Sequence, residues 1–466
     1  MQTISYKHYV NDFVLINKYK KIAGGIFMNK IKKLLAITCA LTLTAGLFAA
    51  CGSGGSSNSS SSDGKNVTVD IFQFKVEAKD ALDKAAKAYT DKHKNVTINI
   101  QTVGGGQDYS AALKSKFASG QEPAIYNIGG PQELSDWKGK LEDLSSQPWV
   151  SQAYDGTLDS AKVDGKVYGM PFDLEGYGFI YNKNIFKKAG IDPDTIKTFA
   201  DLQKAVDTLN SKKSSLGIQS VFALPGKETW VTGMHTSNVA LGNEFKDAVA
   251  AFNAKTVDFK YGDGFKKLLD IQIQNGYKPD GTNKSINSVD YSTEVEQLFS
   301  LGKVAIIQQG NWISGTVAGI DEDLAKNIGI LPMPIDGTKD GTIPVGVPEY
   351  WAVNSNKDAD TKKAAEDFLN WLYTSDEGKK MIIQDFKFIP PFKGYDASDL
   401  QPTDPLAKDI LKYSKAGNTT PWVFSGYPTG WYDKLLAADI QKYIAGDLTW
   451  DKVISNAKAS WADIRK

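Results

Sequence analysis

Hydrophobic and polar positions alternate with two different periods in the chain that follows residue 65. Residues 67–72 (VTVDIF) and 95–100 (NVTINI) alternate apolar and polar side chains, which predicts two β-strands. Residues 78–92 place apolar side chains on one face of a helix, and 108–119 form a second helix after a glycine triplet. This order of strand, helix, strand and helix favours a parallel sheet with helical crossovers.

The same α/β pattern continues to the C-terminus. Further helices are predicted near 183–189, 199–210, 263–275, 290–300, 361–373 and 375–384, strands near 304–309 and 350–354, and a helical tail over 431–464. No tandem repeat interrupts this pattern. The triplet Gly104–Gly106 lacks the Gly-Lys-Ser/Thr ending of a phosphate-binding loop, so we interpret it as a turn.

The first fifty residues have the pattern of an export signal. A basic run at 29–33 (NKIKK) precedes seventeen uncharged residues at 34–50, and Met28 stands directly before it as an alternative start. The sequence Ala-Ala-Cys at 49–51 resembles a bacterial lipobox, which predicts lipidation of Cys51. The alternative is an uncleaved membrane anchor, for which seventeen residues are short. We therefore assign 1–50 to a signal segment, and 51–65 to the lipidated cysteine and a flexible Gly/Ser tether.

Composition and charge exclude several classes of protein. The 466 residues contain 54 basic and 54 acidic side chains, so no net positive charge favours nucleic acid. Residues 1–50 carry seven of the lysines and one acid, which leaves the chain from residue 51 with a net charge of −6. Arg465 is the only arginine, which argues against a phosphate site built on guanidinium groups. Three histidines and two cysteines argue against a zinc site, and no cofactor is expected.

A long motif near residue 170 resembles a known family. Residues 164–190 read DGKVYGMPFDLEGYGFIYNKNIFKKAG, which is similar to the extracellular solute-binding proteins of ABC importers, in the branch that carries sugars and oligosaccharides. Further matches follow at 117–130 (FASGQEPAIYNIGG), 299–312 (FSLGKVAIIQQGNW), 331–334 (LPMP), 345–354 (VGVPEYWAVN) and 364–382 (AAEDFLNWLYTSDEGKKMI). The resemblance extends over essentially the whole chain from Met28.

This resemblance implies a periplasmic-binding-protein-like fold. Two α/β lobes would be joined by three hinge crossings, with a ligand cleft between the lobes. The crossings are expected near 171–175, 308–311 and 347–352, where strand patterns meet glycine or proline. The first lobe would then contain 66–173 plus 310–349, and the second 174–309 plus 350–466.

Three tryptophans are candidates for stacking against sugar rings. Trp230, Trp312 and Trp431 each follow turn residues rather than lying within a strand or helix pattern. A sugar ring has an apolar C–H face, and a flat aromatic ring covers such a face well. Among family members the positions of Trp312 and Trp431 usually supply stacking rings. We expect all three in the cleft; the alternative is that they are core or surface aromatics.

Polar candidates for the sugar hydroxyls lie at strand ends and crossings. Glu175 and its neighbour Asp173 stand at the first crossing, where Glu175 matches a ligand-contacting acid of maltodextrin binders. Glu349 and Tyr350 stand at the third expected crossing. The remaining candidates, Gln73, Lys75 and Asn127, follow strands at their carboxyl ends, where open α/β sheets bind ligands.

The expected function is capture of a sugar by closure of the cleft. The protein would be a monomer outside the cell membrane, anchored through lipid at Cys51, and would deliver its carbohydrate ligand to a two-subunit ABC permease. Binding of a peptide or polyamine by the same fold is one alternative, and a structural or adhesion lipoprotein is another. A secreted glycoside hydrolase would need two carboxylates about 5–9.5 Å apart, which Asp173 and Glu175 could supply; we expect binding without catalysis.

Overall fold

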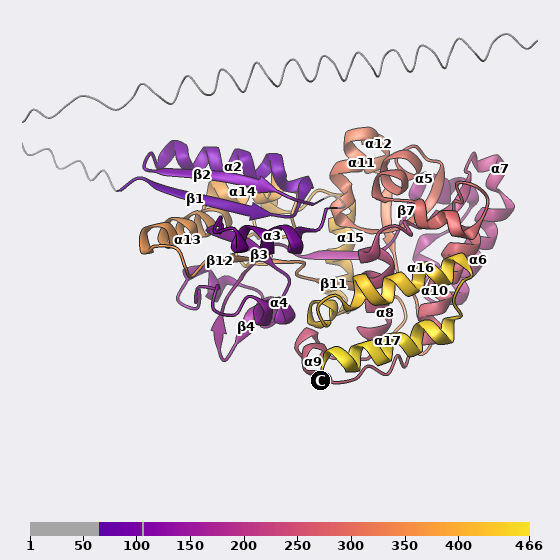
Figure 1. Cartoon of the computed structure of the whole chain (residues 1–466). Coiled ribbons are helices and arrows are strands. Elements are labelled where there is room, and N and C mark those ends of the chain that lie inside the picture. The colour runs from indigo at the N-terminus through magenta and orange to yellow at the C-terminus, as the bar shows by residue number, and fades with distance from the viewer. Residues whose placement is uncertain (1–64, 105–106) are drawn as a thin grey trace, which may run out of the picture. The chain divides into compact units, whose positions relative to one another are not determined.

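The computed structural model describes residues 65–104 and 107–466, whose strands form two large sheets and a separate two-stranded hairpin (Figure 1). The predicted signal segment 1–50, Cys51 and all of the tether except its last residue lie outside the described residues. Within the described ranges, no helix is both long enough and apolar enough to span a membrane.

The first lobe is built on a five-stranded sheet. Its strands, in spatial order, are β2 (Val96–Thr102), β1 (Val67–Gln73), β3 (Ile125–Ile128), β12 (Tyr350–Val353) and β6 (Met170–Pro171). β1 is parallel to β2 and β3, whereas β12 runs antiparallel to β3 and β6. The helices of this lobe are α2 (Lys79–Lys92), α3 (Tyr109–Ala118), α4 (Pro131–Asp136), α13 (Ala359–Thr374) and α14 (Asp376–Gln384), and a hairpin joins β4 (Lys162–Val163) to β5 (Lys166–Val167). Figure 1 shows α2 beside β1 and β2.

The second lobe is built on a six-stranded sheet. Its central strand β7 (Glu175–Asn182) is buried at every residue. β7 pairs with β9 (Val304–Gly310) on one side and with β10 (Ile328–Leu331) and β11 (Ile343–Gly346) on the other. The two outer strands are β8 (Ser220–Ala223), which pairs with β9, and β13 (Thr419–Thr420), which pairs with β11. The helices are α5 (Lys183–Ala189), α6 (Phe199–Ser211), α7 (Lys213–Leu216), α8 (Thr236–Leu241), α9 (Ala248–Asn253), α10 (Gly262–Asn275), α11 (Ser314–Ile320), α12 (Glu322–Ala325), α15 (Pro405–Lys415), α16 (Ala437–Ala445) and α17 (Trp450–Ile464). Three segments are π-helical: Trp230–His235, Ser292–Phe299 and Trp431–Leu436.

Local sequence explains where these elements begin and end. The Asn182 side chain accepts hydrogen bonds from the backbone N–H groups of residues 184 and 185 and so caps α5, which ends at Gly190 in the left-handed conformation (φ 74°). Thr198 and Asp201 form a capping box at the start of α6. The motif over 164–190 therefore encodes a crossing, a buried strand and a capped helix in succession.

The division between the lobes differs from the prediction in two segments. β10 and β11 pair with β7, so residues 310–346 of the segment predicted for the first lobe belong to the second lobe. β12 pairs with β3 and β6, and α13 packs against β1, so residues 350–384 belong to the first. The predicted crossing at 308–311 is wrong, because β9 continues into a turn and α11, whose Ile313 and Val317 pack in the second lobe.

The described chain crosses between the two large sheets at three points, two of which lie within the predicted crossings 171–175 and 347–352. It crosses at residues 172–174, between β6 and β7, and at 347–349, between β11 and β12. The third crossing follows α14 and ends at α15, which packs against β10. The first and third crossings are joined, because the backbone N–H of Leu174 donates to the carbonyl of Ile389 at 2.8 Å.

A second region of contact between the lobes involves α4. Arg465, which follows α17, donates from Nη1 to Gln132 Oε1 at 2.8 Å and from Nη2 to the carbonyl of Gly426 at 2.6 Å. Thr429 Oγ1 donates to Asp136 Oδ2 at 2.8 Å. The single arginine of the chain therefore bridges the second lobe to the first.

Candidate functional site

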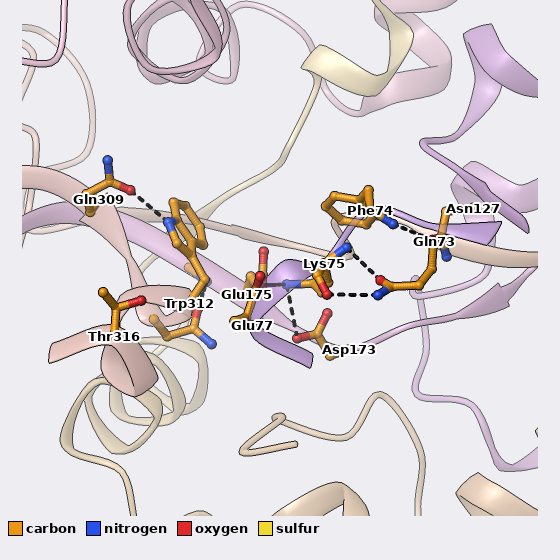
Figure 2. A network of polar contacts seen from close by, with 12 residues as sticks. Gln73, Phe74, Lys75, Glu77, Asn127, Asp173, Glu175, Gln309, Trp312 and Thr316 are labelled. Atoms are coloured by element: carbon orange, nitrogen blue, oxygen red, sulfur yellow. Dashed lines mark hydrogen bonds and ion pairs between the residues drawn. The ribbon is translucent and has the colours of Figure 1, made fainter. Parts of the chain in front are cut away.

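A buried lysine with three carboxylates lies where β1 ends. Lys75 is 3% exposed, and its Nζ pairs with Glu175 and lies 3.1 Å from Glu77 and 4.0 Å from Asp173 (Figure 2). The rings of Phe74, Phe172 and Phe388 surround the same ammonium, with centroids 5.6–5.8 Å away. Lys75 therefore connects the first lobe to the first crossing and to the start of β7.

The charges of this cluster are strongly coupled. Burial lowers the pKa of Lys75, but the three carboxylates outweigh burial and raise that pKa well above its ordinary value. Burial raises the pKa of Asp173 well above its ordinary value and also raises that of Glu175; Lys75 opposes both shifts. The ammonium therefore stays charged, while the carboxyl groups of Asp173 and Glu175 bind protons more readily than exposed ones.

Several buried polar atoms around Lys75 have no hydrogen-bond partner among the residues that the structure describes. Both carboxyl oxygens of Asp173, which is 1% exposed, are in this state, as are Asn127 Nδ2 and Glu349 Oε2. Asn127 Oδ1 accepts from the backbone N–H of Phe74 at 3.4 Å. A buried polar atom left unpaired costs about 1–3 kcal/mol, so hydroxyl groups of a ligand would relieve a real penalty here.

A half-exposed aromatic surface belongs to the second lobe. Trp312 and Trp230 are half-buried, with ring centroids 6.0 Å apart, and Tyr291 lies 6.4 Å from Trp230. His235 packs beneath both indoles at 5.3 and 5.4 Å and stacks on Tyr177 at 4.2 Å. Burial lowers the pKa of His235 to about 3, so this ring is neutral and acts as apolar support.

The fold brings the aromatic surface next to the charged cluster. β7 begins at Glu175, and its next residue, Gly176, donates from its backbone N–H to Asn311 Oδ1 at 3.1 Å. A Cβ atom at Gly310 would lie 2.2 Å from the ring of Trp312, so only glycine lets this ring lie against the strand end. Figure 2 shows Trp312 beside Glu175, with Lys75 beyond it.

The structure brings together most of the predicted polar residues and two of the predicted tryptophans. Five of the predicted polar residues lie in or beside the charged cluster: Lys75, Asp173, Glu175, Asn127 and Glu349. Burial and the charge of Glu133 raise the pKa of Glu349 well above its ordinary value, while the charge of Lys75 opposes this shift. Gln73 has a supporting position, because its Nε2 donates to the carbonyl of Lys75 at 3.0 Å and its Oε1 accepts from the backbone N–H of Lys75 at 2.6 Å.

Two predicted site residues lie in the hydrophobic core instead. Trp431 is 0% exposed, donates from Nε1 to the carbonyl of Ala457 at 3.0 Å, and packs against Trp461 at 4.9 Å. Tyr350 is 2% exposed, and its hydroxyl donates to the carbonyl of Thr157 at 2.9 Å. The prediction for both was wrong, because a turn before Trp431 and a crossing before Tyr350 do not determine which way the side chain points.

Sequence reasoning missed several residues that support the site. Glu77 contacts Lys75, and Glu228 accepts from the indole of Trp230 at 3.0 Å. Gln309 and Glu294 form a chain of hydrogen bonds behind Trp312. Glu77 and Glu228 each stand two residues from a predicted site residue, Lys75 and Trp230, and this proximity in sequence could have identified them. No comparable proximity in sequence connects Glu294 to Trp312. In the described part of the chain, no group of three histidine, cysteine, aspartate or glutamate residues is arranged to hold a metal ion.

Comparisons with known proteins agree with this architecture. The family model for bacterial extracellular solute-binding proteins matches residues 84–410. The multiple sugar-binding protein of Streptococcus mutans is 25% identical over 380 residues, which cover 78% of this chain and 84% of the relative. The maltodextrin-binding protein MdxE of Bacillus subtilis is 26% identical over 412 residues, covering 84% and 88%.

Solved structures show the same fold. A chitin oligosaccharide binding protein superposes with a TM-score of 0.71 at 23% identity, and the match covers 86% of this chain and all of that one. The two α/β lobes of the predicted fold class are therefore confirmed. With a family model that spans most of the folded chain, this protein belongs to the bacterial extracellular solute-binding proteins.

Proposed function

We propose that this protein is the substrate-binding component of an ABC importer and that its ligand is a sugar or oligosaccharide. The observation that carries the proposal is the juxtaposition of the Trp312 ring with the Lys75 cluster. A sugar has an apolar ring face and a polar edge, and this site offers a half-exposed indole beside buried donors and acceptors. The curated relatives named above bind maltodextrin and multiple sugars, which supports the same class.

The site also supports capture by closure. Lys75 belongs to the first lobe and Trp312 to the second, whereas Asp173 lies in the first crossing and Glu175 at the start of β7 in the second lobe. A ligand that stacks on Trp312 and accepts a hydrogen bond from Asn127, which lies on β3 of the first lobe, therefore contacts both lobes. Such a ligand stabilises the arrangement in which these groups are close together, which is a shift of population toward the closed form.

We extend the proposal to location and partners. The Ala-Ala-Cys sequence at 49–51 supports lipidation of Cys51 and anchoring at the outer face of the cell membrane. The ligand would pass to a two-subunit permease, and the binding protein would act as a monomer without catalysis.

A thermal-shift screen tests the proposal. The purified protein is heated with maltotriose, raffinose, xylotriose or chitotriose, with a tripeptide and spermidine as controls. A ligand present at a hundred times its Kd stabilises the folded protein by about 2.7 kcal/mol, so a shift of several degrees is expected with one sugar. Recovery of that sugar intact after incubation would support binding without hydrolysis, whereas cleavage products would contradict it.

A polyamine is the second candidate ligand. The acids Glu77, Asp173 and Glu175 all lie within 4.0 Å of one cation, Lys75. Both oxygens of Asp173 and one of Glu349 have no hydrogen-bond partner among the described residues. A shift with spermidine and none with any sugar would keep the site and replace the proposed ligand.

A further inference from the structure

The indole N–H groups of Trp312 and Trp230, the two half-buried tryptophans of the site, are hydrogen-bonded to side chains that include a glutamate. Trp312 Nε1 donates to Gln309 Oε1 at 2.7 Å, and Gln309 Nε2 donates to Glu294 Oε2 at 2.6 Å. Trp230 Nε1 donates directly to Glu228 Oε2 at 3.0 Å. Figure 2 shows the bond from Trp312 to Gln309 on the side of the ring away from Lys75.

The chain behind Trp312 lies in the protein interior. Gln309 and Glu294 are each 0% exposed, Gln309 on β9 and Glu294 in the π-helical segment Ser292–Phe299. Burial raises the pKa of Glu294 well above its ordinary value; the bond from Gln309 opposes this shift, and the charge of Glu228 adds to it. Glu294 Oε1 has no partner within the described ranges. An apolar side chain would fill this position at lower cost than a carboxyl group.

The chemistry of an amide explains what this carboxyl group does. A glutamine side chain has one carbonyl oxygen and one NH₂ group, which are nearly equal in shape. Glu294 accepts from the NH₂ group, so the carbonyl oxygen of Gln309 is turned toward the indole N–H of Trp312. If the acceptor at residue 294 were lost, the amide could rotate and place its NH₂ group against the indole N–H, which would repel it.

We propose that Glu294 and Gln309 are positioning residues that fix the ring of Trp312 in the orientation that stacks on the ligand. Glu294 sets the amide of Gln309, Gln309 holds the indole N–H, and Gly310 leaves room for the ring. The indole N–H of Trp312 is thereby occupied, so this side chain offers the ligand its face and no hydrogen bond. The inference rests on the proposed function, because it assumes a ligand that stacks on Trp312.

A fixed ring binds more tightly than a mobile one, because its side-chain entropy is already lost before binding. Losing this preorganisation for one side chain weakens the affinity by about three- to tenfold. We therefore expect Glu294→Leu and Gln309→Leu each to weaken sugar binding by about that factor. Glu294→Gln keeps an acceptor for the amide of Gln309 and is expected to bind as the wild type does.

The first experiment needs no ligand. In ¹H–¹⁵N spectra of the ligand-free protein, the indole resonance of Trp312 is assigned by its loss in Trp312→Phe. We expect a shifted and faster-exchanging resonance in Glu294→Leu and Gln309→Leu and an unchanged one in Glu294→Gln. Gln272→Leu is the matched control, because Gln272 is also a 0% exposed amide of this lobe and donates instead to Gln308 at 2.9 Å. An unchanged Trp312 resonance in Gln309→Leu would overturn the proposal.

The second experiment separates positioning from a general effect on the lobe. Affinities for raffinose, maltotriose, xylotriose and chitotriose are measured for Glu294→Leu in the wild-type and Trp312→Phe backgrounds. Positioning through the indole predicts a loss in the first background and none in the second. Equal losses in both backgrounds would show a structural role and overturn the inference. If the wild type binds none of these sugars, the proposed function fails, while the indole resonance still decides whether Glu294 and Gln309 orient Trp312.

Discussion

Replacement of Trp431 by alanine should destabilise the protein rather than its complex with a sugar. The side chain is fully buried between Trp461 and Tyr427, with ring centroids 4.9 and 5.1 Å away. Its indole N–H donates to the carbonyl of Ala457, which connects the π-helical segment to α17. The residue therefore holds the C-terminal helices on the second lobe.

The expected loss follows from this burial. A tryptophan hides about 150–250 Å² of surface, which at about 25 cal/mol per Å² amounts to about 4–6 kcal/mol. Alanine retains a small part of this contribution, which leaves about 3–5 kcal/mol. In the variant the carbonyl of Ala457 still accepts a hydrogen bond from Ser460 Oγ at 3.1 Å, so the lost indole hydrogen bond adds little to the loss of unfolding free energy. The loss is a large fraction of the about 5–15 kcal/mol that stabilises an ordinary domain.

Urea unfolding followed by circular dichroism measures this loss, with sugar affinity measured on the folded fraction. Trp312→Ala is the matched variant, because Trp312 is half-buried and lies at the proposed site. We expect Trp312→Ala to weaken binding at least tenfold, about 1.4 kcal/mol, with a much smaller change in unfolding. A Trp431→Ala protein that unfolds at the wild-type urea concentration but binds sugar tenfold less tightly would refute the reasoning.

Three further variants test the charged groups and the contact between the lobes. Lys75→Met leaves buried carboxylates without their cation and should lower the free energy of unfolding by about 3–5 kcal/mol near pH 7.5. The difference in urea midpoint from the wild type should shrink toward pH 5 as those acids protonate. Equal differences at both pH values would contradict this. Glu294 has a raised pKa in the folded state, so its contribution to stability is full below about pH 4.3 and is lost as pH rises through the raised value. Glu294→Gln should therefore be more stable than the wild type at pH 8 and equal to it near pH 4, and a pH-independent difference would argue against the buried acid. Arg465→Ala removes the hydrogen bond from the second lobe to Gln132 of α4 and should increase the radius of gyration of the ligand-free protein in X-ray scattering. An unchanged radius would show that this hydrogen bond does not hold the lobes together.

The sequence predicted the elements well because their signals are local. The alternation at 67–72 and the capped motif at 164–190 determine strands and helix ends through residues that are close along the chain. The same local reasoning treats Trp312 and Trp431 alike, because each follows a turn containing glycine. Their different burial is decided by Trp461, thirty residues after Trp431, and by a strand end at Gly310 that admits the ring of Trp312.

The exchange of segments between the lobes has a similar cause. Both 308–311 and 347–352 show a strand pattern that meets glycine or proline, yet only the second is a crossing. Whether a strand end continues on its own sheet depends on which strand it pairs with next, and pairing partners are distant in sequence: β10 pairs with β7 about 150 residues earlier. Periodicity alone cannot encode that choice.

The position of Lys75 suggests why the acids at the crossings are buried rather than exposed. Phe172 of the first crossing and Phe388 of the third both lie within 6 Å of its ammonium, and Glu349 of the second crossing is coupled to its charge. The first and third connections between the lobes therefore meet at one cation, and the charge of that cation also opposes the rise that burial causes in the pKa of Glu349 in the second. A ligand hydroxyl that donates to an oxygen of Asp173, neither of which has a hydrogen-bond partner among the described residues, changes the electrostatic balance at this point. Such a ligand would act on the connections themselves as well as on the surfaces of the two lobes. Binding and closure would then depend on the same few side chains. Lys75→Met should therefore alter both the sugar affinity and the ligand-induced change in radius of gyration. Trp312→Ala should weaken the affinity but leave the change in radius of gyration at saturating sugar intact.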